Sequence, residues 1–107
     1  MENIANYFKL EEGYETYYDN NAFCVYGVLN DEFYIAHLYV KDRTKSYSFF
    51  KEVKELAREK GCKIISGNID INEHNKDDYT KKVLVHLKHG YKIVNVGPNR
   101  ITVIYEL

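Results

Sequence analysis

Apolar side chains in the middle of the chain recur at the spacing of an amphipathic helix. Five of them occupy i, i+3, i+4 and i+7 offsets, namely Phe49, Phe50, Val53, Leu56 and Ala57. Ser46 precedes this group and Gly61 follows it, and these residue types commonly begin and end helices. The pattern predicts a helix over residues 46–60 with one apolar face.

A second helical pattern runs from Asp77 to Gly90. Its apolar positions are Val83, Leu84 and Leu87. Asp77 or Asp78 is placed to cap the free N–H groups at the start of this helix. Near the other end of the chain, residues 2–10 have helical spacing and Gly13 follows them, which predicts a short N-terminal helix.

The remaining apolar and β-branched runs are too short for helices and predict six strands. They span residues 14–19, 22–29, 33–40, 63–69, 91–96 and 101–107. The first three are separated by Asn- and Asp-rich turns, so we expect an antiparallel meander. The central helix then connects the third strand to the fourth as a strand-helix-strand crossover. This order of elements predicts an α+β fold.

Composition predicts one ordinary globular domain over residues 1–107, with no linker and no internal repeat. No apolar run approaches the ~20 residues of a membrane helix. Because the first ten residues lack a basic start followed by an apolar stretch, we expect a cytoplasmic protein rather than a secreted one. Cys24 and Cys62 are far apart in the sequence, which favours two free buried thiols.

Charge is unevenly distributed although the net charge is −1. Residues 1–40 hold one Lys and seven acids, whereas residues 41–63 hold eight basic residues and four acids. Four of these basic residues share the central helix with three Glu, which is typical of a solvated face, so nucleic-acid binding is not favoured. Eleven Tyr, one Pro and no Trp suggest A- and T-rich coding, as in low-GC bacteria and their phages.

Three segments together resemble the GNAT superfamily of acyl-CoA-dependent N-acetyltransferases. They are residues 35–40 (IAHLYV), 51–62 (KEVKELAREKGC) and 89–94 (HGYKIV). They look like the family's fourth strand, third helix and terminal Gly-aromatic signature, and the likeness covers residues 22–107. The resemblance implies a mixed, mostly antiparallel sheet flanked by helices, and transfer of acetyl from acetyl-CoA to an amine. Residues 1–21 are too few for the family's usual first strand and two helices, which wall the acceptor site.

In the family, an R/Q-x-x-G-x-G/A loop joins that strand to that helix, and its backbone N–H groups hold the diphosphate of acetyl-CoA. In one register, the matching positions are Lys41, Thr44 and Ser46, so both glycines and the leading Arg are replaced. In the other register, they are Arg43, Ser46 and Ser48, which keeps the Arg but replaces both glycines. The glycine signature is broken in either register.

Positive charge and hydroxyl groups compensate in part for the missing glycines. Lys41, Arg43 and Lys45 lie within five residues of one another. Ser and Thr hydroxyls can also donate hydrogen bonds to phosphate oxygens. The resemblance therefore implies weakened rather than lost binding of acetyl-CoA.

Two histidines are candidates for proton transfer. Many family members place a Tyr as general acid four residues before the terminal Gly, and here that position is His86. An imidazolium titrates near neutral pH and can protonate a leaving thiolate, although a surface or capping role also fits His86. His37 lies on the strand that faces the implied cleft, where members often hold the group that deprotonates the amine. Alternation places His37 on the side of Ile35 and opposite Leu38, which also fits a half-buried position.

Three functions stay open from the sequence alone. The first is a binding or structural module with weak or absent acetyl transfer, for example in a phage particle or against a host protein. The second is an active, divergent N-acetyltransferase. The third is an interaction protein whose tyrosines and final strand pair with another subunit or a second copy. No metal site is predicted, because His74 and His89 have no supporting Cys or acid at ligand spacing.

Overall fold

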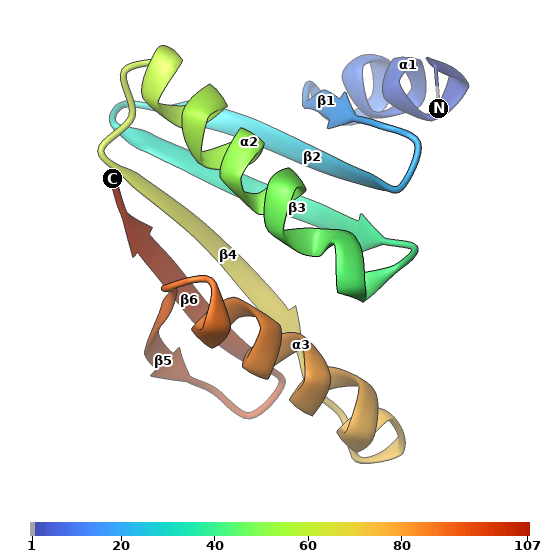
Figure 1. The fold of residues 1–107 in the computed structure, drawn as a ribbon, viewed down its shortest axis with the longest axis vertical. Helices are drawn as coiled ribbons and strands as arrows, with labels where there is room; N and C mark the ends of the chain where they lie inside the picture. Colours follow the sequence, from blue (N-terminus) through green and yellow to red (C-terminus); the bar gives the residue numbers. More distant parts are fainter. Residues whose placement is uncertain (1) are drawn as a thin grey trace.

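A computed structural model of the chain describes residues 2–107 (Figure 1). The elements are α1 (Glu2–Glu12), β1 (Glu15–Tyr18), β2 (Ala22–Leu29), β3 (Glu32–Val40), α2 (Ser46–Glu59), β4 (Ile64–Asp70), α3 (Lys76–Lys88), β5 (Lys92–Val96) and β6 (Arg100–Glu106). Two short 3-10 turns, η1 (Arg43–Lys45) and η2 (Glu73–Asn75), precede α2 and α3. The predicted order of helices and strands is confirmed, with ends that differ by a few residues. None of the described helices is long and apolar enough to cross a membrane.

The six strands form one sheet in the order β1-β2-β3-β4-β6-β5. Every neighbouring pair is antiparallel except β3 and β4, which run parallel and are connected through α2. The predicted α+β fold with a mixed, mostly antiparallel sheet is therefore confirmed. The last strand, β6, lies between β4 and β5, so the expectation that it offers an open edge is wrong. The open edges belong to β1 and β5.

Helices cover the two faces of the sheet unequally (Figure 1). α2 and α3 lie on the same face, where the ring centroids of Phe50 and His86 are 5.5 Å apart. The core fills the space between these helices and the sheet and includes Phe33, Ile35, Phe49, Phe50, Val53, Ile65 and Val103. The apolar face predicted for the central helix is thus the buried face. Cys24 and Cys62 are also buried and free, as expected.

A local irregularity in β3 changes which side chains face the helices. His37 pairs with Val25, and Ile35 pairs with Tyr26, so Ala36 has no partner on β2. This β-bulge shifts the alternation of β3 by one residue. Ile35 and Leu38 therefore both pack on the core side, although strict alternation would place them on opposite faces. The prediction that His37 shares a face with Ile35 is wrong for this reason.

The helix starts differ from the predicted caps. α2 begins at Ser46 itself, and its cap residue Lys45 makes no side-chain hydrogen bond there. The cap of α3 is Asn75, and Asp77 and Asp78 lie inside the first turn, where a carboxylate interacts favourably with the helix dipole. The 3-10 turns before both helices explain the difference, because each turn moves the capping position upstream.

Candidate functional site: the cleft between β3 and β4

The parallel strands β3 and β4 pair over only part of their length. Their register ends at Ile35 opposite Gly67. Beyond this point residues 37–40 pair only with β2, and residues 68–70 pair only with β6. Figure 1 shows the two ribbons diverging toward their carboxyl ends. The facing strand edges therefore carry backbone N–H and C=O groups that no neighbouring strand uses.

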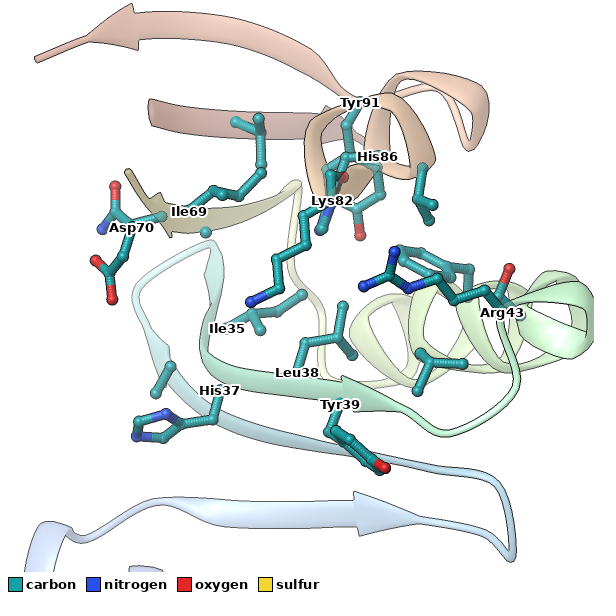
Figure 2. Close-up of a pocket in the computed structure, with 18 of the residues that line it drawn as sticks. Ile35, His37, Leu38, Tyr39, Arg43, Ile69, Asp70, Lys82, His86 and Tyr91 are labelled. Carbon is teal, nitrogen blue, oxygen red and sulfur yellow. Dashed lines mark hydrogen bonds between the residues drawn. The ribbon is translucent and has the colours of Figure 1, made fainter. Parts of the chain in front are cut away.

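A cavity of about 490 Å³ occupies the fork and extends under α2 and α3. Its inner wall is apolar and includes Ile35, Leu38, Phe50 and Val103. Its mouth is polar: Figure 2 shows Lys82 of α3 pointing across the cavity toward β3, with Arg43 beside it. A mostly apolar cavity of a few hundred Å³ with a small number of polar groups is typical of small-molecule sites.

The charged groups at the mouth are paired with one another. Arg43 Nη2 lies 3.2 Å from Asp78 Oδ1, and Lys82 Nζ lies 3.4 Å from Asp78 Oδ2. The charge on Lys82 and the hydrogen bond from Arg43 lower the pKa of Asp78, so this carboxyl group is ionised at neutral pH. Two cations thus share one carboxylate at the mouth of the cavity.

The loop between β3 and α2 uses its own polar groups internally. The Asp42 carboxylate accepts hydrogen bonds from the Thr44 backbone N–H at 3.0 Å and from Thr44 Oγ1 at 2.6 Å. These bonds lower the pKa of Asp42. The next two N–H groups donate within the same turn, from Lys45 to Asp42 O and from Ser46 to Arg43 O. Three consecutive N–H groups of this loop are therefore already satisfied.

Ser46 joins the start of α2 to the end of α3. Its Oγ lies 3.3 Å from His89 Nε2, and both side chains are buried. The His89 ring stacks on Phe50 with centroids 4.2 Å apart, and the His89 carbonyl accepts from Lys54 Nζ at 2.7 Å. Burial, followed by the charge on Lys54, lowers the pKa of His89. The Ser46 hydroxyl is thus engaged in a contact between helices.

Only some of the predicted cofactor residues reach the cavity. Arg43 and Ser46 are among the residues that line it. The other four, Lys41, Thr44, Lys45 and Ser48, are exposed to solvent along the loop and the first turn of α2. The first predicted register therefore brings one residue, Ser46, to the cavity, and the second brings two, Arg43 and Ser46.

His86 lines the cavity in a form that accepts rather than donates a proton. Its Nδ1 lies 2.7 Å from the Lys82 carbonyl, so Nδ1 carries the hydrogen and Nε2 keeps a lone pair. Burial is the main cause that lowers the pKa of His86. The ring is held edge-on between Phe50 and Tyr91. At neutral pH the side chain is thus mostly uncharged, which disfavours the predicted role as an imidazolium acid.

His37 points away from His86. In Figure 2 its side chain leaves β3 on the side opposite Leu38. Its ring lies 5.0 Å from that of Phe8 in α1, and its Nε2 lies 4.0 Å from the Glu12 carboxylate. The side chains of the two predicted catalytic histidines therefore point to opposite faces of the sheet, although both residues are among those that line the cavity.

Tyr91 and Lys82 are cavity residues that sequence reasoning missed. Tyr91 is only 3% exposed, and its hydroxyl has no hydrogen-bond partner within the described structure. Burial raises the pKa of Tyr91 above the ordinary value of a tyrosine, so the hydroxyl keeps its proton. In the sequence, a Tyr after Gly90 looks like an ordinary core aromatic residue, so nothing indicates that its hydroxyl lacks a hydrogen-bond partner. Lys82 carried a usable signal, because it lies four residues after Asp78 and four before His86 on one helix face.

Solved structures with the same arrangement of elements include N-acetyltransferases. The PaiA N-acetyltransferase of Thermoplasma acidophilum, solved in complex with coenzyme A, matches 81% of this chain with a TM-score of 0.67 at 12% identity. The GNAT domain of S. lividans PAT matches 81% with a TM-score of 0.64 at 17% identity. The chain has the GNAT fold. No protein-family model and no curated protein matches the sequence.

This chain is short for the GNAT fold. It spans 54% of the length of the Thermoplasma protein and 54% of the S. lividans chain. The anti-CRISPR protein AcrVA5 is similar in length: the match covers 83% of this chain and 96% of AcrVA5, with a TM-score of 0.64 at 14% identity. At these identities the likenesses show the fold alone. They also show that a short form of the GNAT fold occurs in another protein.

Acetyl-CoA, which the GNAT fold implies, fits the cleft in part. The free edges of β3 and β4 match the two amides of a pantetheine arm, because an extended amide chain can pair with an open strand edge. The loop before α2 does not match a diphosphate, because its N–H groups are bonded internally and the Asp42 carboxylate lies among them. The site is thus suited to one end of the cofactor and poorly suited to the other.

Proposed function

We propose that this protein is acetyltransferase-like, binds the acyl-pantetheine end of a thioester in the cleft between β3 and β4, and transfers acetyl groups slowly or not at all. The fork between the two parallel strands carries the proposal. Its unpaired edges and its cavity of about 490 Å³ supply both the backbone partners and the space that such an arm requires.

The state of the two histidines supports slow transfer. Acyl transfer to an amine needs a base for the amine and an acid for the leaving thiolate. His86 is held as a neutral acceptor, and His37 lies on the other face of the sheet against Phe8. The two predicted histidines therefore do not form a pair of proton-transfer groups on one face of the sheet.

An active N-acetyltransferase is the second candidate, and one observation favours it. The free Nε2 lone pair of His86 belongs to a residue that lines the cavity, so this group is suited to accept a proton from an amine.

AcrVA5, which this chain covers almost completely, is an anti-CRISPR protein. We therefore include proteins beside small amines as acceptors in the screen.

Calorimetry and a transfer assay test the proposal together. We expect acetyl-CoA to bind with a Kd of about 0.1–1 mM at low salt. With amines, peptides and lysine-rich proteins as acceptors, we expect turnover below about 0.01 per second, against about 10 per second for a typical enzyme. Absence of heat at millimolar ligand would contradict the binding claim. Turnover near the typical value would favour the second candidate.

Gly67→Ala tests whether the cavity is the binding site. A Cβ atom at Gly67 would meet Ile35 Cβ at 3.7 Å, which is an ordinary contact, so the strand tolerates a methyl group there. Because Gly67 lines the cavity at the base of the fork, that methyl group takes up ligand space. We expect folding to be retained, as judged by circular dichroism, and binding to be weakened. Unchanged binding would place the ligand elsewhere.

A further inference from the structure

We infer that the cleft selects its donor by the pantetheine arm alone and gains no affinity from the diphosphate and adenosine of CoA, and that Asp42 sets this selection. The inference rests on the proposed function, since it concerns binding in the same cleft. It names both the part of the donor that is recognised and the residue that opposes the diphosphate.

The carboxylate of Asp42 has a fixed position at the end of β3. The Asp42 backbone N–H donates to Asn21 Oδ1 at 2.9 Å, and Asn21 Nδ2 donates to the Asp42 carbonyl at 3.2 Å. These two bonds join the loop to the turn between β1 and β2. The side chain is held in turn by both bonds from Thr44. The loop therefore does not need a ligand to become ordered.

Three of the donors that a diphosphate would use, the N–H groups of residues 44–46, are already bonded. The Thr44 N–H binds the Asp42 carboxylate, and the N–H groups of Lys45 and Ser46 bind carbonyls of the same turn. A phosphate oxygen could gain the first donor only by displacing an anion that the protein itself carries. Like charges at such short range repel, so the carboxylate opposes a diphosphate even when it is not displaced.

The two nearest cations of the loop, Arg43 and Lys45, already have carboxylate partners. Lys45 Nζ lies 4.0 Å from Asp42 Oδ2, and the Arg43 guanidinium binds Asp78 across the mouth of the cavity. Each of these cations has a carboxylate partner before any ligand arrives. The hydroxyl of Ser46, the remaining polar group at the start of α2 that lines the cavity, contacts His89.

The inner part of the cleft suits an uncharged arm instead. Its apolar wall and the two free strand edges match a chain that alternates methylenes and amides. The Tyr91 hydroxyl is an unpartnered polar group that is more than nine-tenths buried, on a side chain that lines this cavity. A buried hydroxyl without a partner favours a ligand that supplies an acceptor.

Titration calorimetry with three probes tests the selection. Pantetheine and CoA share the arm, and adenosine 3′,5′-bisphosphate carries only the nucleotide part. We expect pantetheine and CoA to bind within about threefold of each other at low salt, and the nucleotide alone not to bind. CoA binding at least tenfold tighter than pantetheine would overturn the inference while leaving the proposed function intact. Failure of all three probes would overturn both.

Asp42→Asn tests the residue itself. The Asn carbonyl can still accept from the Thr44 N–H, so the loop keeps its shape while it loses one negative charge. We expect the affinity for CoA to rise about five- to tenfold and the affinity for pantetheine to stay the same. Asp31→Asn is the matched control, because it removes the same charge at the other end of β3, where Asp31 pairs with Lys63. An equal gain in both variants, or no gain in Asp42→Asn, would contradict the role of Asp42.

Discussion

The buried hydroxyl of Tyr91 lowers the stability of the free protein. A buried polar group without a hydrogen-bond partner typically costs about 1–3 kcal/mol. Tyr91 carries such a group at 3% exposure, between the rings of His86 and Tyr105. Proteins leave buried polar groups without hydrogen-bond partners mainly at functional sites. Tyr91 is therefore the residue at which a stability cost and a ligand contact are expected to coincide.

Replacement of Tyr91 by Phe measures the stability cost of the buried hydroxyl. We expect Tyr91→Phe to raise the free energy of unfolding by about 1 kcal/mol, because it removes an unsatisfied hydroxyl and keeps the ring. Tyr17→Phe is the control, since the Tyr17 hydroxyl donates to Glu52 at 3.2 Å and its loss should be neutral or destabilising. Urea unfolding measures both. Destabilisation of Tyr91→Phe beyond that of Tyr17→Phe would show that the Tyr91 hydroxyl has a partner.

At the scale of elements, the contact between Ser46 and His89 connects the start of α2 to the end of α3. The helices themselves could be predicted, because periodic apolar positions are a local signal. Their junction could not, since Ser46 and His89 are 43 residues apart. Dependence on distant residues also explains the wrong face predicted for His37. The bulge at Ala36 depends on how β3 pairs with β2, so simple alternation along the sequence places His37 on the face of Ile35.

Burial of His86 and His89 makes the stability depend on pH. Both have folded-state pKa values below the ordinary value of about 6.5, so the unfolded chain binds more protons than the folded chain once the pH falls below about 6.5. Stability is therefore expected to be constant above that pH and to fall as the pH drops toward 5. The carboxyl groups with shifted pKa values, Asp42 and Asp78, lose their contribution only at lower pH, because their values are lowered.

Urea unfolding at pH 7.5 and pH 5.5 measures this dependence. His89→Asn is expected to remove about half of the difference, because one of the two buried imidazoles is then absent. His74→Asn is the control, since His74 is exposed in the turn before α3. A pH difference that is the same in all three proteins would show that neither buried histidine causes it.

At the scale of the whole molecule, the strand order follows from rules that a sequence can carry. Short Asn- and Asp-rich turns favour hairpins, and a helix between two strands favours a parallel crossover. The resemblance to GNAT proteins predicted where a cofactor would lie. It could not predict the internal bonding of the loop, because the decisive partners of Asp42 and Arg43 include Asn21 and Asp78, which are 21 and 35 residues away. The substituted glycines predict weakened binding of acetyl-CoA, and the internal hydrogen bonds of the loop are a second, independent reason to expect it.

The central claim is that the fork between β3 and β4 binds a pantetheine arm. An NMR titration of ¹⁵N-labelled protein with pantetheine tests it most directly, because each backbone amide reports its own surroundings. The account predicts saturable shifts at residues 36–40 and 68–70, whose amides line the two free edges, with Tyr91 also affected. Saturable shifts confined to α1 and β1, or no shifts at millimolar pantetheine, would contradict it.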